Sequence, residues 1–189
     1  MPLQRNRVVV SQTSPTRSKS REQTSVNQRS NHFDDKGNAH MVDVSEKATT
    51  VRVATASADV IMKGETAKTI QAAKISKGDV LGIARIAGIQ AAKSTAQLIP
   101  LCHTIPIEAV SVRFAWTAND ADSNRATLNC IVEVRTSAKT GVEMEAMTAA
   151  SIACLTVYDM IKSADRTAVI TNLRLIQKSG GKSGDFQSS

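Results

Sequence analysis

The sequence predicts a single α+β domain in which helices pack on an antiparallel sheet, and three patterns support this prediction. Several segments alternate between apolar and polar side chains, which is typical of half-buried strands. Other segments are long and rich in Ala, Leu, Ile and Met, which favours buried helices. Two of the alternating segments are separated only by a short polar stretch, so they should pair as an antiparallel hairpin.

The first half of the domain reads as a strand followed by two helices. Residues 51–62 are rich in Val, Thr and Ala with partial alternation, which predicts a strand. Residues 65–73 suit a short helix, which Gly78 separates from the next one. Residues 79–98 form a mostly apolar second helix, which Pro100 ends because proline cannot continue a helix.

The second half reads as two strands, a helix and a last strand. Residues 110–116 and 126–134 alternate, and the sequence NDADSN at 119–124 between them has turn chemistry. Residues 142–163 form a long helix without Pro or Gly, and residues 169–175 alternate again. The order β-α-β-β-α-β is that of the ferredoxin-like fold, with an antiparallel sheet and helices on one face. A small two-layer domain cannot cover such apolar helices alone, so we expect an oligomer.

The basic residues are concentrated in an N-terminal tail rather than in the domain. The formal net charge is +7, but residues 1–31 hold six Lys or Arg against one acidic residue. The tail lacks aromatic residues and is rich in Ser, Thr, Gln and Arg, so we expect it to be disordered. It is either an Arg-rich transit peptide or an extension without a targeting role. Residues 32–186 then form one near-neutral domain with a flexible Gly/Lys segment at 178–189, and nothing in its charge indicates nucleic-acid binding.

Composition excludes several classes of protein. No window has the roughly 18 consecutive apolar residues of a membrane-spanning helix. Cys102, Cys130 and Cys154 form no CxxC pair, which argues against a disulfide scaffold and against a Cys-based zinc site. There is also no Rossmann fingerprint, Cys cluster or haem motif. Free thiols fit the reducing cytoplasm.

Polar residues within otherwise apolar segments are the candidates for chemistry. His103 lies in a loop between Pro100 and Pro106. It serves either as an acid, base or phosphate donor, or as a hydrogen-bonded structural residue. Asp159 and Lys162 are three residues apart, hence neighbours on one helix face. They are either a surface ion pair or a lysine tuned by a carboxylate for proton transfer.

Glu143 and Glu145 stand at the start of the helix predicted over 142–163, where carboxylates suit the helix dipole. If this helix is continuous, Glu145 and Asp159 lie about 21 Å apart, at about 1.5 Å per residue. One small substrate cannot easily touch both side chains. Glu145 is therefore structural, or two subunits share one site, or the site is a long cleft.

The C-terminal sequence KSGGKSGD at 178–185 ends like a phosphate-binding loop. However, the earlier glycine of a Walker-type loop is replaced by Ile176, and no helix follows. The segment is either a flexible tail or a mobile lid whose Lys178 and Lys182 close on phosphates. The remaining candidate cations are Arg52 and Lys77.

Seven runs of sequence together resemble one enzyme family. The runs are AHMVDV at 39–44, KGDV at 77–80, ARIAGIQAAK at 84–93, LIPLCH at 98–103, KTGVEMEAMTAAS at 139–151, YDM at 158–160 and KSGGKSGDF at 178–186. In this order they closely resemble the cyclic pyranopterin monophosphate synthase family, also called molybdenum cofactor biosynthesis protein C, from about residue 32 to 186. The family is described as ferredoxin-like and as a homohexamer, a trimer of dimers, with active sites at subunit interfaces.

The resemblance implies a reaction on a cyclised GTP derivative. The family converts 3′,8-cyclo-7,8-dihydro-GTP to cyclic pyranopterin monophosphate and releases pyrophosphate, an early step of molybdenum cofactor biosynthesis, without a redox cofactor. The resemblance also implies catalytic roles for Asp159, Lys162 and Lys77. The residues that match its substrate contacts are Leu101, Cys102, His103, Met144, Glu145, Arg52 and Glu143. The tail lysines Lys178 and Lys182 would help to neutralise the triphosphate.

Two functions of other classes stay open at this stage. A ferredoxin-like module can bind RNA by stacking bases on sheet aromatics, here Phe114 and Trp116. We expect their face of the strand to pack against the helices instead. The other alternative is a non-catalytic scaffold, against which the intact Lys77, His103, Asp159 and Lys162 argue.

Overall fold

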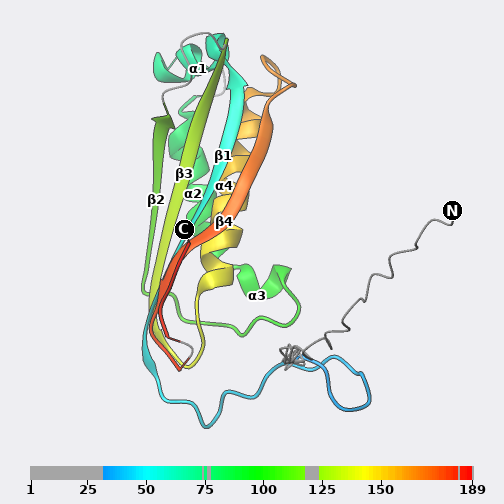
Figure 1. Ribbon diagram of the computed structural model, residues 1–189. Coiled ribbons are helices and arrows are strands. Elements are labelled where there is room, and N and C mark those ends of the chain that lie inside the picture. The colour runs from blue at the N-terminus through cyan, green and yellow to red at the C-terminus, as the bar shows by residue number, and fades with distance from the viewer. Residues whose placement is uncertain (1–31, 74, 76–77, 118–123, 183, 189) are drawn as a thin grey trace, which may run out of the picture. The chain divides into compact units, whose positions relative to one another are not determined.

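The described residues form an α+β fold built on one antiparallel sheet, and α2 and α4 lie side by side behind it (Figure 1). The computed structural model describes residues 32–73, 75, 78–117, 124–182 and 184–188. Their strands are β1 Thr50–Lys63, β2 Ala109–Thr117, β3 Arg125–Ala138, β4 Val169–Ser179 and β5 Phe186–Gln187. The sheet order is β2-β3-β1-β4-β5, so the first strand lies at its centre. This confirms the predicted α+β class and antiparallel sheet. The expectations for the tail 1–31, for Lys77 and for most of the turn 119–124 lie outside the described residues.

Strand pairing follows the predicted pattern and adds one irregularity. The expected hairpin is confirmed, because β2 pairs with β3 from Ala109 opposite Arg135 onward. β1 pairs with β4 with register shifts around Ser57, and Asn172 opposite this region has a positive φ of 53°. Asn172 and Asn129 both donate side-chain hydrogen bonds to the carboxylate of Asp59, at 2.8 and 2.7 Å. One carboxylate on β1 thus links strands β4 and β3.

The helices agree with the predictions except at one break. They are α1 Gly64–Gln71, α2 Val80–Lys93, α3 Thr95–Leu98 and α4 Glu143–Ile161. Asp79 caps α2 by accepting a hydrogen bond from the Gly82 amide at 2.9 Å. The prediction of one helix over 79–98 is wrong at Ser94, where the backbone (φ −105°, ψ 7°) ends α2. The Thr95 hydroxyl bonds back to the last turn of α2, so the second half becomes the separate α3. Apolar periodicity continues across this break and therefore could not reveal it.

Small residues let α2 and α4 pack closely on the sheet. Ala146, Ala149 and Ala153 of α4 are fully buried. A Cβ on Gly88 of α2 would lie only 3.2 Å from the carbonyl oxygen of Ala149, so a larger residue there would push the helices apart. α4 contacts β1, β3 and β4, so the core lies between these strands and the helices.

The sheet has one buried and one more open face. Along β3, every second residue from Leu128 to Val134 is fully buried, while Glu133 and its neighbours are only partly covered. Phe114 and Trp116 of β2 pack against the same core, which confirms that their face is covered by the helices. They are therefore not a platform for stacking bases, and the RNA-binding alternative loses its support.

Helix α4 is apolar on nearly all sides because it is a core helix. It is the one described helix long and apolar enough to cross a membrane by length and composition, but 50% of that stretch is buried inside the fold. On the helix layer Ile83, Ile86 and Leu155 stay exposed, at 47%, 66% and 53% of their surface. A single chain thus leaves large apolar side chains of its helices uncovered, as the helix composition predicted.

Candidate active site

Arg52 joins three strands at the end of the sheet where β1 begins. Its Nε donates to the carbonyl of Ala138, at the end of β3, at 3.4 Å. Its Nη1 donates to the carbonyl of Gly180, just after β4, at 3.2 Å. Gly180 and Gly181 both have positive φ, of 90° and 85°, and a Cβ on Gly181 would run into the Arg52 guanidinium. The glycine pair is therefore required for the chain to fold back over Arg52.

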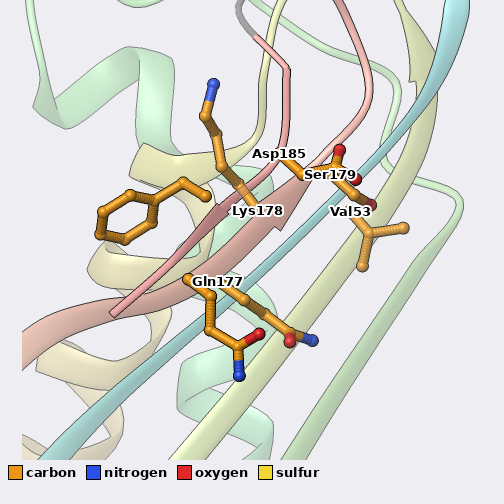
Figure 2. A pocket seen from close by; sticks show the side chains of 7 residues that line it. Val53, Gln177, Lys178, Ser179 and Asp185 are labelled. Atoms are coloured by element: carbon orange, nitrogen blue, oxygen red, sulfur yellow. The ribbon is translucent and has the colours of Figure 1, made fainter. Parts of the chain in front are cut away.

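An ion pair lies next to this guanidinium. Lys178 of β4 and Glu143 at the start of α4 are 3.7 Å apart, and both side chains are partly buried. Figure 2 shows the side chains of Lys178 and Gln177 leaving opposite faces of β4. The antiparallel pair of β4 and β5 borders a hollow of about 390 Å³. Its lining residues are Val53, Gln177, Lys178, Ser179, Asp185, Phe186 and Gln187. The Asp185 carboxylate accepts a hydrogen bond from the Gly180 amide at 3.2 Å, which closes the turn that carries Lys182.

Glu145 is the buried carboxyl group of this end of the molecule. Its residue is only 3% exposed. Burial raises its pKa from 4.5 to about 6, and the nearby Glu143 carboxylate adds to the rise. The Cys102 thiol has a raised pKa as well, through burial and through the charge of Glu145. The 99–106 loop therefore lies close to the start of α4, where a partly protonated carboxyl group can give or take a proton near neutral pH.

His103 stands on the same loop and is held by the chain preceding β1. Its Nε2 lies 2.8 Å from the carbonyl oxygen of Val42. Lys139, in the loop between β3 and α4, donates a hydrogen bond to the carbonyl of Ser45 at 2.7 Å. Residues 42–45 thus contact the loop that carries His103 and the loop that leads into α4.

Asp159 and Lys162 occupy the opposite end of α4. Their side chains form an ion pair of 2.5 Å and are 57% and 51% exposed. They border a hollow of about 470 Å³ whose other lining residues are Ile152, Leu155, Thr156 and Tyr158. α4 is continuous from Glu143 to Ile161, so this pair lies about 21 Å from Glu145 along the helix axis.

The structure therefore gathers some predicted site residues and separates others. The residues near the start of β1 and α4 are Arg52, Cys102, His103, Glu143, Met144, Glu145 and Lys178, with Leu101 on the same loop and Lys182 on the β4–β5 turn. Asp159 and Lys162 are remote from them within one chain. Lys77 lies outside the described residues. Among the described residues no group of three or more His, Cys, Asp or Glu could hold a metal ion.

Sequence reasoning missed two parts of this site. The carbonyl groups of Val42 and Ser45 carry no pattern that marks them, because they are backbone atoms, and Lys139 acts through the Ser45 carbonyl. The close contact of Gly181 with Arg52 was also missed. The adjacent Gly180 and Gly181 after a strand were a usable signal, because such pairs often mark positive φ.

A small α+β fold that brings arginine, lysine, histidine and a buried glutamate to one end of its sheet has the groups expected of an enzyme active site. The chain belongs to the MoaC family, whose model matches residues 41–181.

Curated relatives named cyclic pyranopterin monophosphate synthase agree with this assignment, and three of them illustrate the similarity. The protein of Rhodopirellula baltica is 56% identical over 164 residues, which are 84% of this chain and 93% of the relative. That of Cereibacter sphaeroides is 51% identical over 84% of this chain and 96% of the relative. That of Bacillus subtilis is 47% identical over 82% of this chain and 90% of the relative.

Proposed function

We propose that this chain converts 3′,8-cyclo-7,8-dihydro-GTP to cyclic pyranopterin monophosphate and releases pyrophosphate, an early step of molybdenum cofactor biosynthesis. The observation that carries the proposal is the cluster of Arg52, Lys178, His103 and Glu145 at one end of the sheet, inside the region that matches the MoaC family. The close relatives carry the name of this activity.

The charges of the cluster suit this substrate. A triphosphate carries about four negative charges, which Arg52, Lys178 and Lys182 neutralise by charge-assisted hydrogen bonds. Cyclic phosphate forms when a ribose hydroxyl oxygen attacks the α-phosphorus and the bond to the leaving pyrophosphate breaks. The hydroxyl proton passes to a base, and no electrons are gained or lost overall in this step. No redox cofactor enters the proposal.

The proposed roles divide into proton transfer and substrate contact. Lys77, Asp159 and Lys162 move protons at the purine and ribose. The contacts to the substrate come from Leu101, Cys102, His103, Met144, Glu145, Glu143 and Arg52. Because Glu145 and Asp159 stand at opposite ends of one helix, a small substrate reaches both only where two chains meet.

We therefore propose a ferredoxin-like subunit that assembles into a homohexamer, a trimer of dimers, with active sites at subunit interfaces. Exposed Ile83, Ile86 and Leu155 supply apolar surface for association. Leu155 also lines the hollow beside Asp159, so covering this surface would close the exposed half of the site. We place the enzyme in the cytoplasm.

The test is a turnover assay with the purified full chain. The protein receives 3′,8-cyclo-7,8-dihydro-GTP, and pyrophosphate and the pterin product are measured together, with Asp159→Ala as the matched inactive control. We expect both products to appear in equal amounts with the wild type alone. Absence of both, with substrate verified and the assembly intact, would favour the scaffold alternative.

A further inference from the structure

A segment before β1, residues 42–45, is held against the candidate site by two of its carbonyl groups. The carbonyl oxygen of Val42 lies 2.8 Å from Nε2 of His103. The carbonyl oxygen of Ser45 accepts a hydrogen bond from Nζ of Lys139 at 2.7 Å. Because His103 precedes β2 and Lys139 precedes α4, the segment links two loops that are distant in sequence.

The partner of Nε2 decides which nitrogen of His103 carries the proton. A backbone carbonyl can only accept a hydrogen bond, so Nε2 must be the donor. In a neutral imidazole the other nitrogen, Nδ1, is then an acceptor with a free lone pair. No hydrogen bond to Nδ1 is formed by any of the described residues. The ring therefore presents Nδ1 as its available nitrogen.

The 42–45 segment is shaped by its own bonds as well as by the two loops. The Asp43 carboxylate accepts a hydrogen bond from the Ser45 amide at 2.8 Å, and the Lys47 amide donates to the Val44 carbonyl at 3.0 Å. Hydrogen bonds from Ser45 lower the pKa of Asp43, with smaller contributions from Lys139 and His103. The carboxylate therefore stays charged and attracts the Lys139 ammonium that holds the segment in place.

We propose that the 42–45 segment fixes His103 as the Nε2–H tautomer, so that Nδ1 is the nitrogen that meets the substrate, with Lys139 as a positioning residue. A backbone carbonyl can select a tautomer without titrating itself, so the selection holds over the whole pH range in which the ring is neutral. The identity of the substrate rests on the proposed function, whereas the tautomer of His103 does not.

The tautomer can be measured directly in the full chain without substrate. The protein is labelled with ¹⁵N-histidine, and long-range ¹H–¹⁵N spectra are recorded at mildly alkaline pH, where an imidazole is neutral. The chain has three histidines, so His32→Gln and His40→Gln variants assign the signals. We expect His103 to be nearly all Nε2–H, with an Nε2 proton protected from exchange with water. His40, which is exposed, is the internal reference. An Nδ1–H form, or a mixture like that of His40, would overturn the proposal.

Variants of Lys139 test how the segment is held. Lys139→Met keeps the apolar stem and removes the donor to Ser45, so the Nε2 proton should exchange about ten- to a hundredfold faster, and kcat should fall about as much. Lys139→Arg, which keeps a donor, should restore both. The matched control is Lys47→Met, an exposed lysine of the same region, which should change neither. A purely structural role of Lys139 would lower the melting temperature without altering the His103 spectrum, and this outcome would refute it as a positioning residue.

The experiments distinguish failure of the proposed function from failure of the His103 tautomer assignment. A wild type with the Nε2–H spectrum but no turnover would refute the proposed function and leave the tautomer assignment standing. A wild type that turns substrate over with His103 in the Nδ1–H form would refute the assignment alone. If Lys139→Met does not fold, the spectrum of the wild type still decides the tautomer.

Discussion

The two ends of helix α4 differ in their surroundings although both carry candidate site residues. At the first end, Glu145 is buried, Glu143 pairs with Lys178, and Arg52 joins three strands nearby. At the other end, Asp159 and Lys162 pair with each other in solvent, beside the exposed Leu155. One chain builds the first end by itself, whereas it leaves the second end open. This difference is what motivates the proposal that another subunit completes the second end.

The largest expected effect is on catalysis at the exposed end. Asp159→Ala or Lys162→Ala should lower kcat by about a hundred- to ten-thousandfold, because proton transfer by a positioned group contributes about this much. Stability should change by less than about 1 kcal/mol, since the pair is solvent-exposed and screened. Turnover and chemical denaturation of the same preparations check both statements. Turnover like that of the wild type in either variant would remove that residue from the proposed mechanism.

Mixing inactive subunits tests whether the two ends of α4 belong to one site. Glu145→Ala and Asp159→Ala chains should each be inactive, and equal amounts should regain about one quarter of wild-type activity after dissociation and reassembly. The quarter follows because a site needs an intact Glu145 from one chain and an intact Asp159 from the other, each present with a probability of about one half. Native mass spectrometry confirms subunit exchange. No recovery despite exchange would show that each site is made within one chain.

The smallest expected effect is a pH dependence of the free energy of unfolding, caused by the buried Glu145 near the start of α4. Burial raises the pKa of Glu145 from 4.5 to about 6, so between these values the folded chain holds the proton more tightly than the unfolded chain. The free energy of unfolding should therefore fall as pH rises through this window, by about 2 kcal/mol from this group.

Glu145→Gln should remove this part of the pH dependence, because an amide does not titrate. Denaturation of both proteins between about pH 4 and pH 7 measures the difference, in which the other carboxyl groups largely cancel. A difference that is constant over the window would mean that folding does not raise the pKa of Glu145.

Much of the local structure was predictable because local patterns produce it. Alternation predicted β2, β3 and β4, and the apolar, Gly-free segment predicted α4. The two-residue strand β5 was not predicted, because so short a strand shows no period and forms only by pairing with β4. The break at Ser94 was missed for a related reason, since the apolar positions continue through it.

The sequence by itself determined the order and type of the longer elements and, through its seven matching runs, the family. Its Asp159, Lys162 and His103 could be marked as candidates from position and residue type. Only the tertiary structure decided which of them meet. Arg52 reaches residues 86 and 128 positions away, and His103 reaches Val42 through a backbone carbonyl. Contacts of this kind depend on strand order and on main-chain atoms that every residue shares, so no side-chain pattern records them.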